Sequence, residues 1–145
     1  MKIHQLSLFL ENRPGQLKAA CKILADAGIN LLTLSLADTQ QFGILRLIVR
    51  DWQRAKQVLE EAGRVVNVTE VVAIEVPDRP GGLEEILEVM EEQEIFIEYM
   101  YAFAASPQQK AVLVFRLENT DAAIEALQQK GVNVIGPVEL FNRVE

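Results

Sequence analysis

One short turn motif occurs twice in this sequence, and the duplication limits what the chain can fold into. Asn12-Arg13-Pro14-Gly15-Gln16-Leu17 recurs as Asp78-Arg79-Pro80-Gly81-Gly82-Leu83. Each copy follows a run of alternating apolar residues, which is typical of a strand, and precedes a run with apolar residues at helical spacing. Proline is favoured in the first turn of a helix because the N–H that it lacks would have no partner there. Each motif is therefore predicted to connect a strand to a helix.

The residues that follow each motif repeat the same order of elements. Period-two alternation predicts strands, and helical spacing of apolar residues that ends at a glycine predicts helices. In the first copy we expect strands over residues 6–10, 29–36, 44–50 and 65–68 and helices over residues 17–27 and 52–62. In the second copy we expect strands over residues 72–76, 95–104, 112–117 and 132–141 and helices over residues 83–90 and 120–130. Hairpin loops are predicted at residues 38–41 and 106–109, and a bend in the last strand at Gly136-Pro137.

The spacing of matching residues indicates that one unit is written twice. Pro80 follows Pro14 by 66 residues and Gly131 follows Gly63 by 68, so the second copy has gained two residues, which a hairpin loop tolerates. The order strand-helix-strand-strand-helix-strand is that of the ferredoxin-like α+β fold, with two helices on one face of an antiparallel sheet. We expect two such units, residues 1–70 and 71–145. Pairing their second strands side by side would cover two exposed sheet edges.

The composition argues against several classes of function. The 145 residues carry a net charge of −7 without a basic stripe, so nucleic acid is not an expected partner. No apolar run approaches the length of a membrane span, and the N-terminus lacks a secretory signal. A zinc site needs several Cys or His, whereas the chain has one of each. We find no catalytic constellation, and expect a cytoplasmic protein that is not an enzyme and holds no metal or cofactor.

The repeated motif can also bind an anion. The first backbone N–H groups of a helix have no partner within the helix, and they lie at the positive end of its dipole. The glycine lets a ligand approach the backbone, so the turn can hold a carboxylate. An ordinary strand-to-helix turn that binds nothing is the alternative.

The repeated unit resembles the ACT domains, small amino-acid-sensing modules of biosynthetic enzymes. The residues that carry the resemblance are Asn/Asp-Arg-Pro-Gly-x-Leu after the first strand and Gly28-Ile29-Asn30 before the second strand of the first copy. The first copy is similar to the regulatory domain of phosphoglycerate dehydrogenase and to the small subunit of acetolactate synthase. The resemblance covers essentially the whole chain and implies a tandem of ACT domains.

The resemblance implies a ligand site between the motif of one unit and the start of the second strand of its neighbour. Asn12 would hold the ligand by its side-chain amide, which offers both a donor and an acceptor. The backbone of the residues after it would meet the carboxylate. The candidate residues of the first copy are Asn12, Arg13, Gly15, Gln16, Leu17, Asn30 and Leu31.

The second copy departs from this pattern. Asp78 replaces Asn12 and would repel a carboxylate, although it suits an ammonium group. Glu94-Ile95-Phe96 replaces Gly28-Ile29-Asn30, which removes the second amide. The first copy is therefore the better candidate. Leu10 occupies the position at which serine-sensing relatives have histidine, so serine is not implied. The candidate residues of the second copy are Asp78, Arg79, Gly81, Gly82, Leu83 and Tyr99.

Tyr99 enters this set because Tyr99, Tyr101 and Phe103 alternate along the predicted second strand of the second copy. Their rings can form an aromatic wall for the side chain of a ligand. The alternative is that they pack against a partner subunit or the neighbouring helices.

These observations predict a stand-alone, non-catalytic amino-acid sensor or regulatory protein. We expect a free amino acid as the ligand and a homodimer as the assembly. A biosynthetic enzyme is a candidate partner. The alternative is a regulatory or structural subunit of such an enzyme that binds no small ligand itself. The residues do not specify which amino acid is bound.

Overall fold

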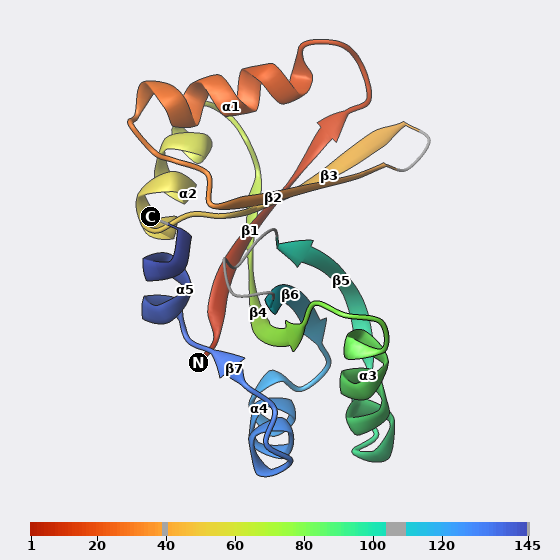
Figure 1. The fold of residues 1–145 in the computed structure, drawn as a ribbon. Helices are drawn as coiled ribbons and strands as arrows, with labels where there is room; N and C mark the ends of the chain where they lie inside the picture. Colours follow the sequence, from red (N-terminus) through yellow and green to blue (C-terminus); the bar gives the residue numbers. More distant parts are fainter. Residues whose placement is uncertain (39–40, 104–109, 145) are drawn as a thin grey trace. The chain divides into compact units, whose positions relative to one another are not determined.

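The computed structural model describes residues 1–38, 41–103 and 110–144 (Figure 1). Residues 39–40 of the first predicted hairpin loop and the whole of the second, residues 106–109, lie outside the described residues. The chain divides into two units, one formed by His4–Thr69 and the other by Met1–Ile3 with Glu70–Glu145. Each unit is an antiparallel sheet with two helices on one face, and the α+β fold expected from the repeat is confirmed.

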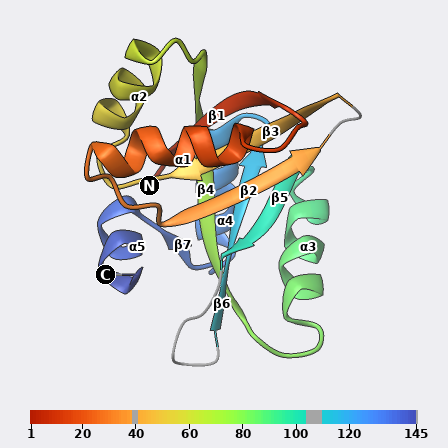
Figure 2. The same cartoon turned by 90° about the horizontal axis from the view of Figure 1, so that it is seen from above.

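The first unit contains β1 (Ile3–Glu11), α1 (Gln16–Asp26), β2 (Thr33–Asp38), β3 (Phe42–Ile48) and α2 (Trp52–Glu61). The strands pair in the order β2-β3-β1, with Leu36 and Leu8 both opposite Leu45. Both helices lie over the same face of these strands (Figure 2). The core consists of leucines from β1 and β3 that meet small and apolar residues of the helices: Leu6, Leu8, Leu10, Leu45, Leu47, Ala20, Leu24, Ala55 and Leu59.

The edge strand β2 leaves part of this face uncovered. Leu34 and Leu36 lie on the core face by register, opposite Leu47 and Leu45, yet they are 50% and 48% exposed. The strand also begins at Thr33, later than the predicted start at residue 29. An apolar stripe therefore runs along an open edge of the first unit.

The second unit contains α3 (Gly82–Glu92), β5 (Ile97–Phe103), β6 (Lys110–Leu117), α4 (Thr120–Gln129), β7 (Val134–Ile135) and α5 (Pro137–Val144). Its strands pair in the order β4-β6-β5, where β4 spans Val66–Pro77, and β7 pairs with β4. Helices α3 and α4 cover the face that carries Val72 and Ile74 of β4 and Phe115 of β6. This is the same architecture as in the first unit, with one helix added.

Strand β4 corrects the predicted strand boundaries. Separate strands were expected at residues 65–68 and 72–76, but one strand runs from Val66 to Pro77. Val66 packs in the core of the first unit, and Val72 packs in the core of the second. No glycine or proline lies between residues 66 and 76, so nothing in the backbone interrupts the extended conformation that β-branched residues favour.

The C-terminal end corrects a second prediction. A closing strand was expected over residues 132–141, but β7 has only two residues and Pro137 begins a helix. Pro137 occupies the first helical position, where proline favours a helix start rather than a bend in a strand. Leu140 is 1% exposed, and Glu139 pairs with Arg143 one turn later, at 2.6 Å. An apolar anchor and an i,i+4 ion pair thus stabilise α5.

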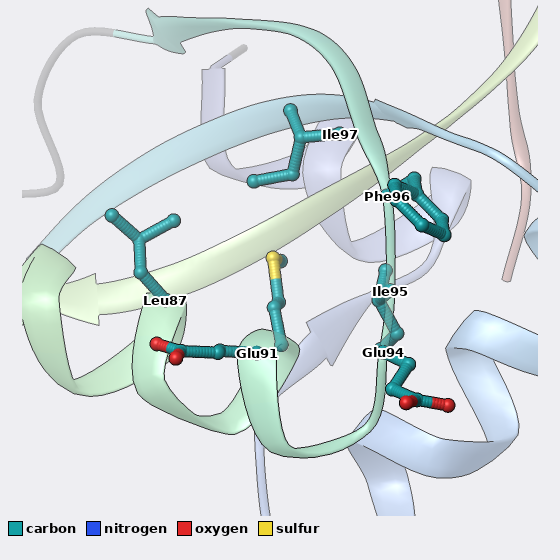
Figure 3. Close-up of a pocket in the computed structure, with 7 residues that line it drawn as sticks. Leu87, Glu91, Glu94, Ile95, Phe96 and Ile97 are labelled. Atoms are coloured by element: carbon teal, nitrogen blue, oxygen red, sulfur yellow. The ribbon is translucent and has the colours of Figure 1, made fainter.

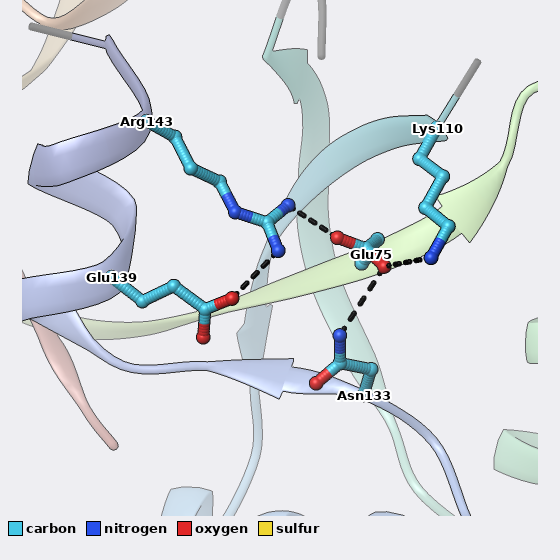
Figure 4. A network of polar contacts seen from close by, with 5 residues as sticks. All are labelled: Glu75, Lys110, Asn133, Glu139 and Arg143. Carbon is cyan, nitrogen blue, oxygen red and sulfur yellow. Dashed lines mark hydrogen bonds and ion pairs between the residues drawn. The ribbon is translucent and has the colours of Figure 1, made fainter. Parts of the chain in front are cut away.

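A polar network connects α5 to the sheet (Figure 4). Glu75 of β4 lies on the face opposite the core, and its side chain is only 8% exposed. Its carboxylate accepts hydrogen bonds from Lys110 at 3.0 Å, from Asn133 at 3.3 Å and from Arg143. Burial raises the pKa of Glu75. The hydrogen bonds from the three partners lower it by more, so the pKa lies below its ordinary value of 4.5.

The lowered pKa gives a pH dependence with a definite sign. Since folding favours the ionised carboxylate, the stabilisation is complete above the ordinary pKa of 4.5 and is lost as the pH falls through the lowered value. We expect Glu75→Gln to reduce the free energy of unfolding by about 1–2 kcal/mol at pH 7, because charge-assisted hydrogen bonds are lost from a mostly buried group. The variant should also show a weaker loss of stability between pH 5 and 3, as urea denaturation at each pH would measure. Glu139→Gln is the matched control, since Glu139 is half exposed and its loss should cost about 0.5 kcal/mol or less. Equal losses in the two variants would contradict the role of Glu75.

Candidate functional site

The two copies of the motif have the same backbone conformation. In each, the arginine N–H donates to the carbonyl two residues earlier, from Arg13 to Glu11 at 2.9 Å and from Arg79 to Pro77 at 3.0 Å. The glycine after the proline is left-handed in both, with φ of 89° at Gly15 and 87° at Gly81. Only glycine adopts this conformation without strain. The glycine is therefore needed for the turn itself, in addition to the access that it gives to the backbone.

The two helices that follow begin without a side-chain cap. Gly15 and Gly81 are the N-cap residues, and neither α1 nor α3 has a side-chain hydrogen bond at its N-terminus. Among the described residues, no acceptor is found for the amides of Leu17 and Lys18, the second and third residues of α1. At α2, by contrast, the Asp51 carboxylate accepts from the Arg54 N–H at 3.1 Å. The start of α1 thus presents two backbone donors to the solvent.

The surroundings of the first loop suit an anion. Asn12 is exposed, and its backbone N–H donates to the Gln41 carbonyl at 3.0 Å, which fixes the loop and leaves its side-chain amide available. A Cβ added at Gly15 would meet nothing within 4 Å, so the backbone is open to a ligand. The first turn of α1 has no acidic residue and includes Lys18. The field at this helix start is therefore positive.

The second loop differs in its charges and its packing. Glu84 and Glu85 occupy the first turn of α3, and both Glu85 oxygens accept from Arg79, at 2.9 and 3.1 Å. Negative charge already lies at this helix start, so a ligand carboxylate would be repelled. Gly82 is buried, and a Cβ there would lie 2.1 Å from the Pro77 carbonyl oxygen. This packing role of Gly82 was not foreseen; its only signal in the sequence is the replacement of Gln16 by glycine.

The remaining candidate residues lie away from these loops. Asn30 is exposed and Leu31 half-buried, and both follow the far end of α1. That helix has 11 residues, so its length of about 16 Å separates them from Asn12 within one unit. Tyr99 lies opposite Arg116, six residues along β6 from Lys110, which is opposite Pro77 beside the second loop. Six residues of strand span about 20 Å, so Tyr99 does not adjoin the second loop of its own unit.

A cavity of about 620 Å³ lies elsewhere in the second unit, between the end of α3 and the start of β5 (Figure 3). Most of its lining is apolar, with two carboxylates: Leu87, Met90, Glu91, Glu94, Ile95, Phe96 and Ile97. None of these residues was among the candidates. In the sequence, Glu94-Ile95-Phe96 differs from Gly28-Ile29-Asn30 of the first copy by the loss of the Asn30 amide, and this difference does not predict a cavity.

A comparison with protein families identifies the chain. The model of the ACT domain pair matches residues 1–143. The chain belongs to the ACT domain pair family. The structure is similar to that of protein BT0572 from Bacteroides thetaiotaomicron, at 40% sequence identity and a TM-score of 0.90, over 97% of this chain and 96% of that one. The predicted tandem ACT fold is thereby confirmed.

More distant solved structures share the fold. The regulatory subunit of aspartate kinase from Thermus thermophilus matches with a TM-score of 0.64 at 18% identity, over 89% of this chain and 93% of that one. Aspartate kinase from Synechocystis matches with a TM-score of 0.58 at 21% identity, over 92% of this chain and 26% of that one. A comparison with curated proteins gave no match.

Within residues 1–38, 41–103 and 110–144, no group of three or more His, Cys, Asp or Glu side chains is placed to hold a metal ion. No helix in the same ranges is long and apolar enough to cross a membrane.

Helices α1, α2, α3 and α4 end in the same hydrogen-bonding pattern, and the residue after the cap is glycine in all of them except α3. After α1, Gly28 donates to Ala25 and Ile29 donates to Leu24. This is the Schellman pattern, in which the first residue past the cap is left-handed and usually glycine. Gly63 and Gly131 occupy that position after α2 and α4, but Glu94 occupies it after α3, with φ of 53°. A side chain that strains the backbone therefore lines the cavity.

Replacing this residue should stabilise the protein. We expect Glu94→Gly to raise the free energy of unfolding by about 1 kcal/mol, because glycine has no Cβ and adopts the left-handed conformation without the steric cost that glutamate has. Glu88→Gly in the interior of the same helix is the matched control, and it should lower stability by about 1 kcal/mol. Denaturant titration of both variants measures the two signs. A loss of stability in Glu94→Gly would show that its side chain contributes more to folding than its backbone strain costs.

Proposed function

We propose that this ACT pair is a non-catalytic regulatory protein that binds a free amino acid at the first loop, residues 12–18. The observation that carries the proposal is the start of α1, where the amides of Leu17 and Lys18 have no acceptor among the described residues and no acidic side chain competes for them. A carboxylate is the group that such a helix start favours.

The ligand would be held by its two charged groups. Its carboxylate would accept hydrogen bonds from the Leu17 and Lys18 amides, with the backbone of Gly15 open beside them. The Asn12 side-chain oxygen would accept from the ammonium group, while its NH₂ would donate to the carboxylate. Arg13 is less available because its guanidinium pairs with Glu11 at 2.6 Å. The second loop is the weaker site for a carboxylate because of Glu84 and Glu85.

Asn30 and Leu31 would join this site only from a second copy of the chain. They lie at the opposite end of α1 from Asn12 in the same unit, so one copy cannot supply both groups to one ligand. A homodimer is therefore part of the proposal. The open edge of β2, with its half-exposed leucines, offers an apolar surface and free backbone groups for such an assembly.

The regulated partner is proposed to be a biosynthetic enzyme of the cytoplasm. A separate regulatory subunit of aspartate kinase has the same tandem fold over 93% of its length, so a fold of this kind can work as a subunit apart from a catalytic chain. A ligand regulates only when it binds one conformation or assembly more tightly than another. A site completed by a second copy would meet that requirement.

Asn12 provides the direct test of the ligand site. Isothermal titration with the amino acid that most stabilises the protein in a thermal-shift panel should show that Asn12→Ala weakens binding about 5- to 150-fold, from hydrogen bonds worth about 1–3 kcal/mol. Asp78→Ala, the same position in the second loop, is the matched control and should leave this affinity unchanged.

Two results would contradict the proposal. Unchanged affinity in Asn12→Ala with a loss in Asp78→Ala would move the site to the second loop. A panel in which none of the twenty amino acids shifts the unfolding temperature at millimolar concentration would favour a subunit that binds no small ligand, since a ligand at about 100 times its dissociation constant adds roughly 2.7 kcal/mol.

A further inference from the structure

The face of the first-unit sheet that points away from α1 and α2 carries exposed aromatic side chains. Leu8 and Leu45 point into the core, so the residues next to them along β1 and β3 point to the other face. There Phe9 is 59% exposed and lies opposite Ile44, and Phe42, in the adjacent pair on this face, is 46% exposed. When helices cover one face of an antiparallel sheet, the other face is commonly polar. Clustered exposed phenylalanines instead indicate a surface for another molecule.

These side chains belong to a surface that we call the outer patch. It spans β1, β3 and β2 in three rows of paired residues: Glu11 and Phe42; Phe9, Ile44 and Ala37; Ser7, Arg46 and Ser35. The middle row is apolar throughout, and the rows on either side of it carry opposite charges, Glu11 in one and Arg46 in the other. An apolar centre between opposite charges is complementary to a second copy of itself that lies with its strands reversed.

We propose that a second copy of this chain packs face to face on the outer patch, about a twofold axis along the middle row. Two sheets that pack in this way keep their strand directions within about 30° of each other, so the rows stay roughly opposed. Phe9 and Ile44 would then meet their own counterparts. Arg46 would lie over the ring of Phe42 and beside the carboxylate of Glu11 in the second copy, and both groups attract a guanidinium.

The ion pair that Glu11 already makes is compatible with this contact. Its carboxylate accepts from Arg13 at 2.6 Å, and more than half of both side chains is exposed. A carboxylate has two oxygens that each accept more than one hydrogen bond. Glu11 can therefore accept from Arg13 of its own chain and from Arg46 of the second copy at the same time.

The outer patch is separate from the open edge of β2. Leu34 and Leu36 of that edge lie on the core face by register, whereas Ser35 and Ala37 lie on the face of the patch. One copy can use both surfaces at once, so this proposal does not depend on the homodimer or the ligand site proposed above. The exposed parts of two phenylalanines amount to a few hundred Å², which is small for an interface. We therefore expect dissociation constants of about 10 µM to 1 mM.

Sedimentation equilibrium of the full chain over that concentration range tests the contact. The average mass of the wild-type chain should rise to about twice the mass at which Phe9→Thr with Phe42→Thr stays. Threonine favours a strand, and urea unfolding would check that the variant folds. A doubling from monomer or from the β2-edge dimer counts equally, so failure of this proposal and failure of the proposed homodimer are distinguishable.

A matched double variant controls for the loss of exposed apolar surface. Val65 and Val138 are 75% and 74% exposed and lie outside the outer patch. Val65→Thr with Val138→Thr should associate as the wild-type chain does. The proposal is overturned if this control loses the doubling as the patch variant does, or if the patch variant and the wild-type chain have the same mass at every concentration.

Charge reversal tests whether the occupant is a second copy. Glu11→Lys and Arg46→Glu alone should each raise the dissociation constant of the doubling about fivefold, from a partly exposed ion pair. The two reversals together restore opposite charges across the twofold axis, so the doubly reversed chain should associate more tightly than either single variant. If the two losses simply add, Glu11 and Arg46 do not meet across the interface, and the proposed packing is wrong.

Discussion

Both units depend on one backbone constraint, a left-handed glycine between a strand and a helix. Gly15 and Gly81 let the chain turn directly from the end of a strand into α1 and α3, so no residue with a capping side chain is placed before either helix. The turn fixes the angle at which each helix returns over its sheet, and the cores in which Leu24 and Met90 are buried follow from that angle. The same turn leaves backbone amides open at the start of α1. Folding and the proposed ligand binding therefore rest on one feature.

The two copies share a backbone but differ in charge at the ends of their first helices. The first turn of α1 carries Lys18 and no acidic residue, whereas α3 begins with Glu84 and Glu85. After the far end, Gly28 follows α1 and Glu94 follows α3. Since negative charge is favoured at the N-terminus of a helix and already lies at the start of α3, the start of α1 is the more favourable of the two for a carboxylate.

Much of the fold could be predicted because its signals are local. Alternation along Leu6, Leu8 and Leu10, the glycine stops and the spacing of 66 residues between the motifs all depend on short stretches of sequence. The predicted boundaries of β4 and of the last strand were wrong because tertiary packing, and not the local sequence, determines where these elements begin and end. The closing strand of one unit and the opening strand of the next are each ordinary strands, and only the structure joins them as β4. Gly136-Pro137 precedes a helix instead of forming a bend in a strand, because burial of Leu140 stabilises α5.

The candidate site was predictable in part, because one portion of it is local in sequence. The motif at Asn12 is contiguous, so its loop could be located, but residues separated by the length of α1 could not be assigned to one site from spacing alone. The cavity beside Glu94 was missed because it forms between a helix end and an edge strand, and the sequence shows it only as a glutamate at a glycine position. No pattern in the sequence identifies the network at Glu75, whose partners come from β6, α5 and the residue before β7.

The most direct test of the central claim is an amide NMR titration of the intact protein with each of the twenty amino acids. We expect one or two of them to shift the backbone amide signals of Leu17 and Lys18 downfield in a saturable way, as new hydrogen bonds to a carboxylate form. The corresponding amides of the second unit, Leu83 and Glu84, should not respond in this manner. If Leu17 and Lys18 stay unchanged with every amino acid while the protein remains folded, the start of α1 is not a carboxylate site.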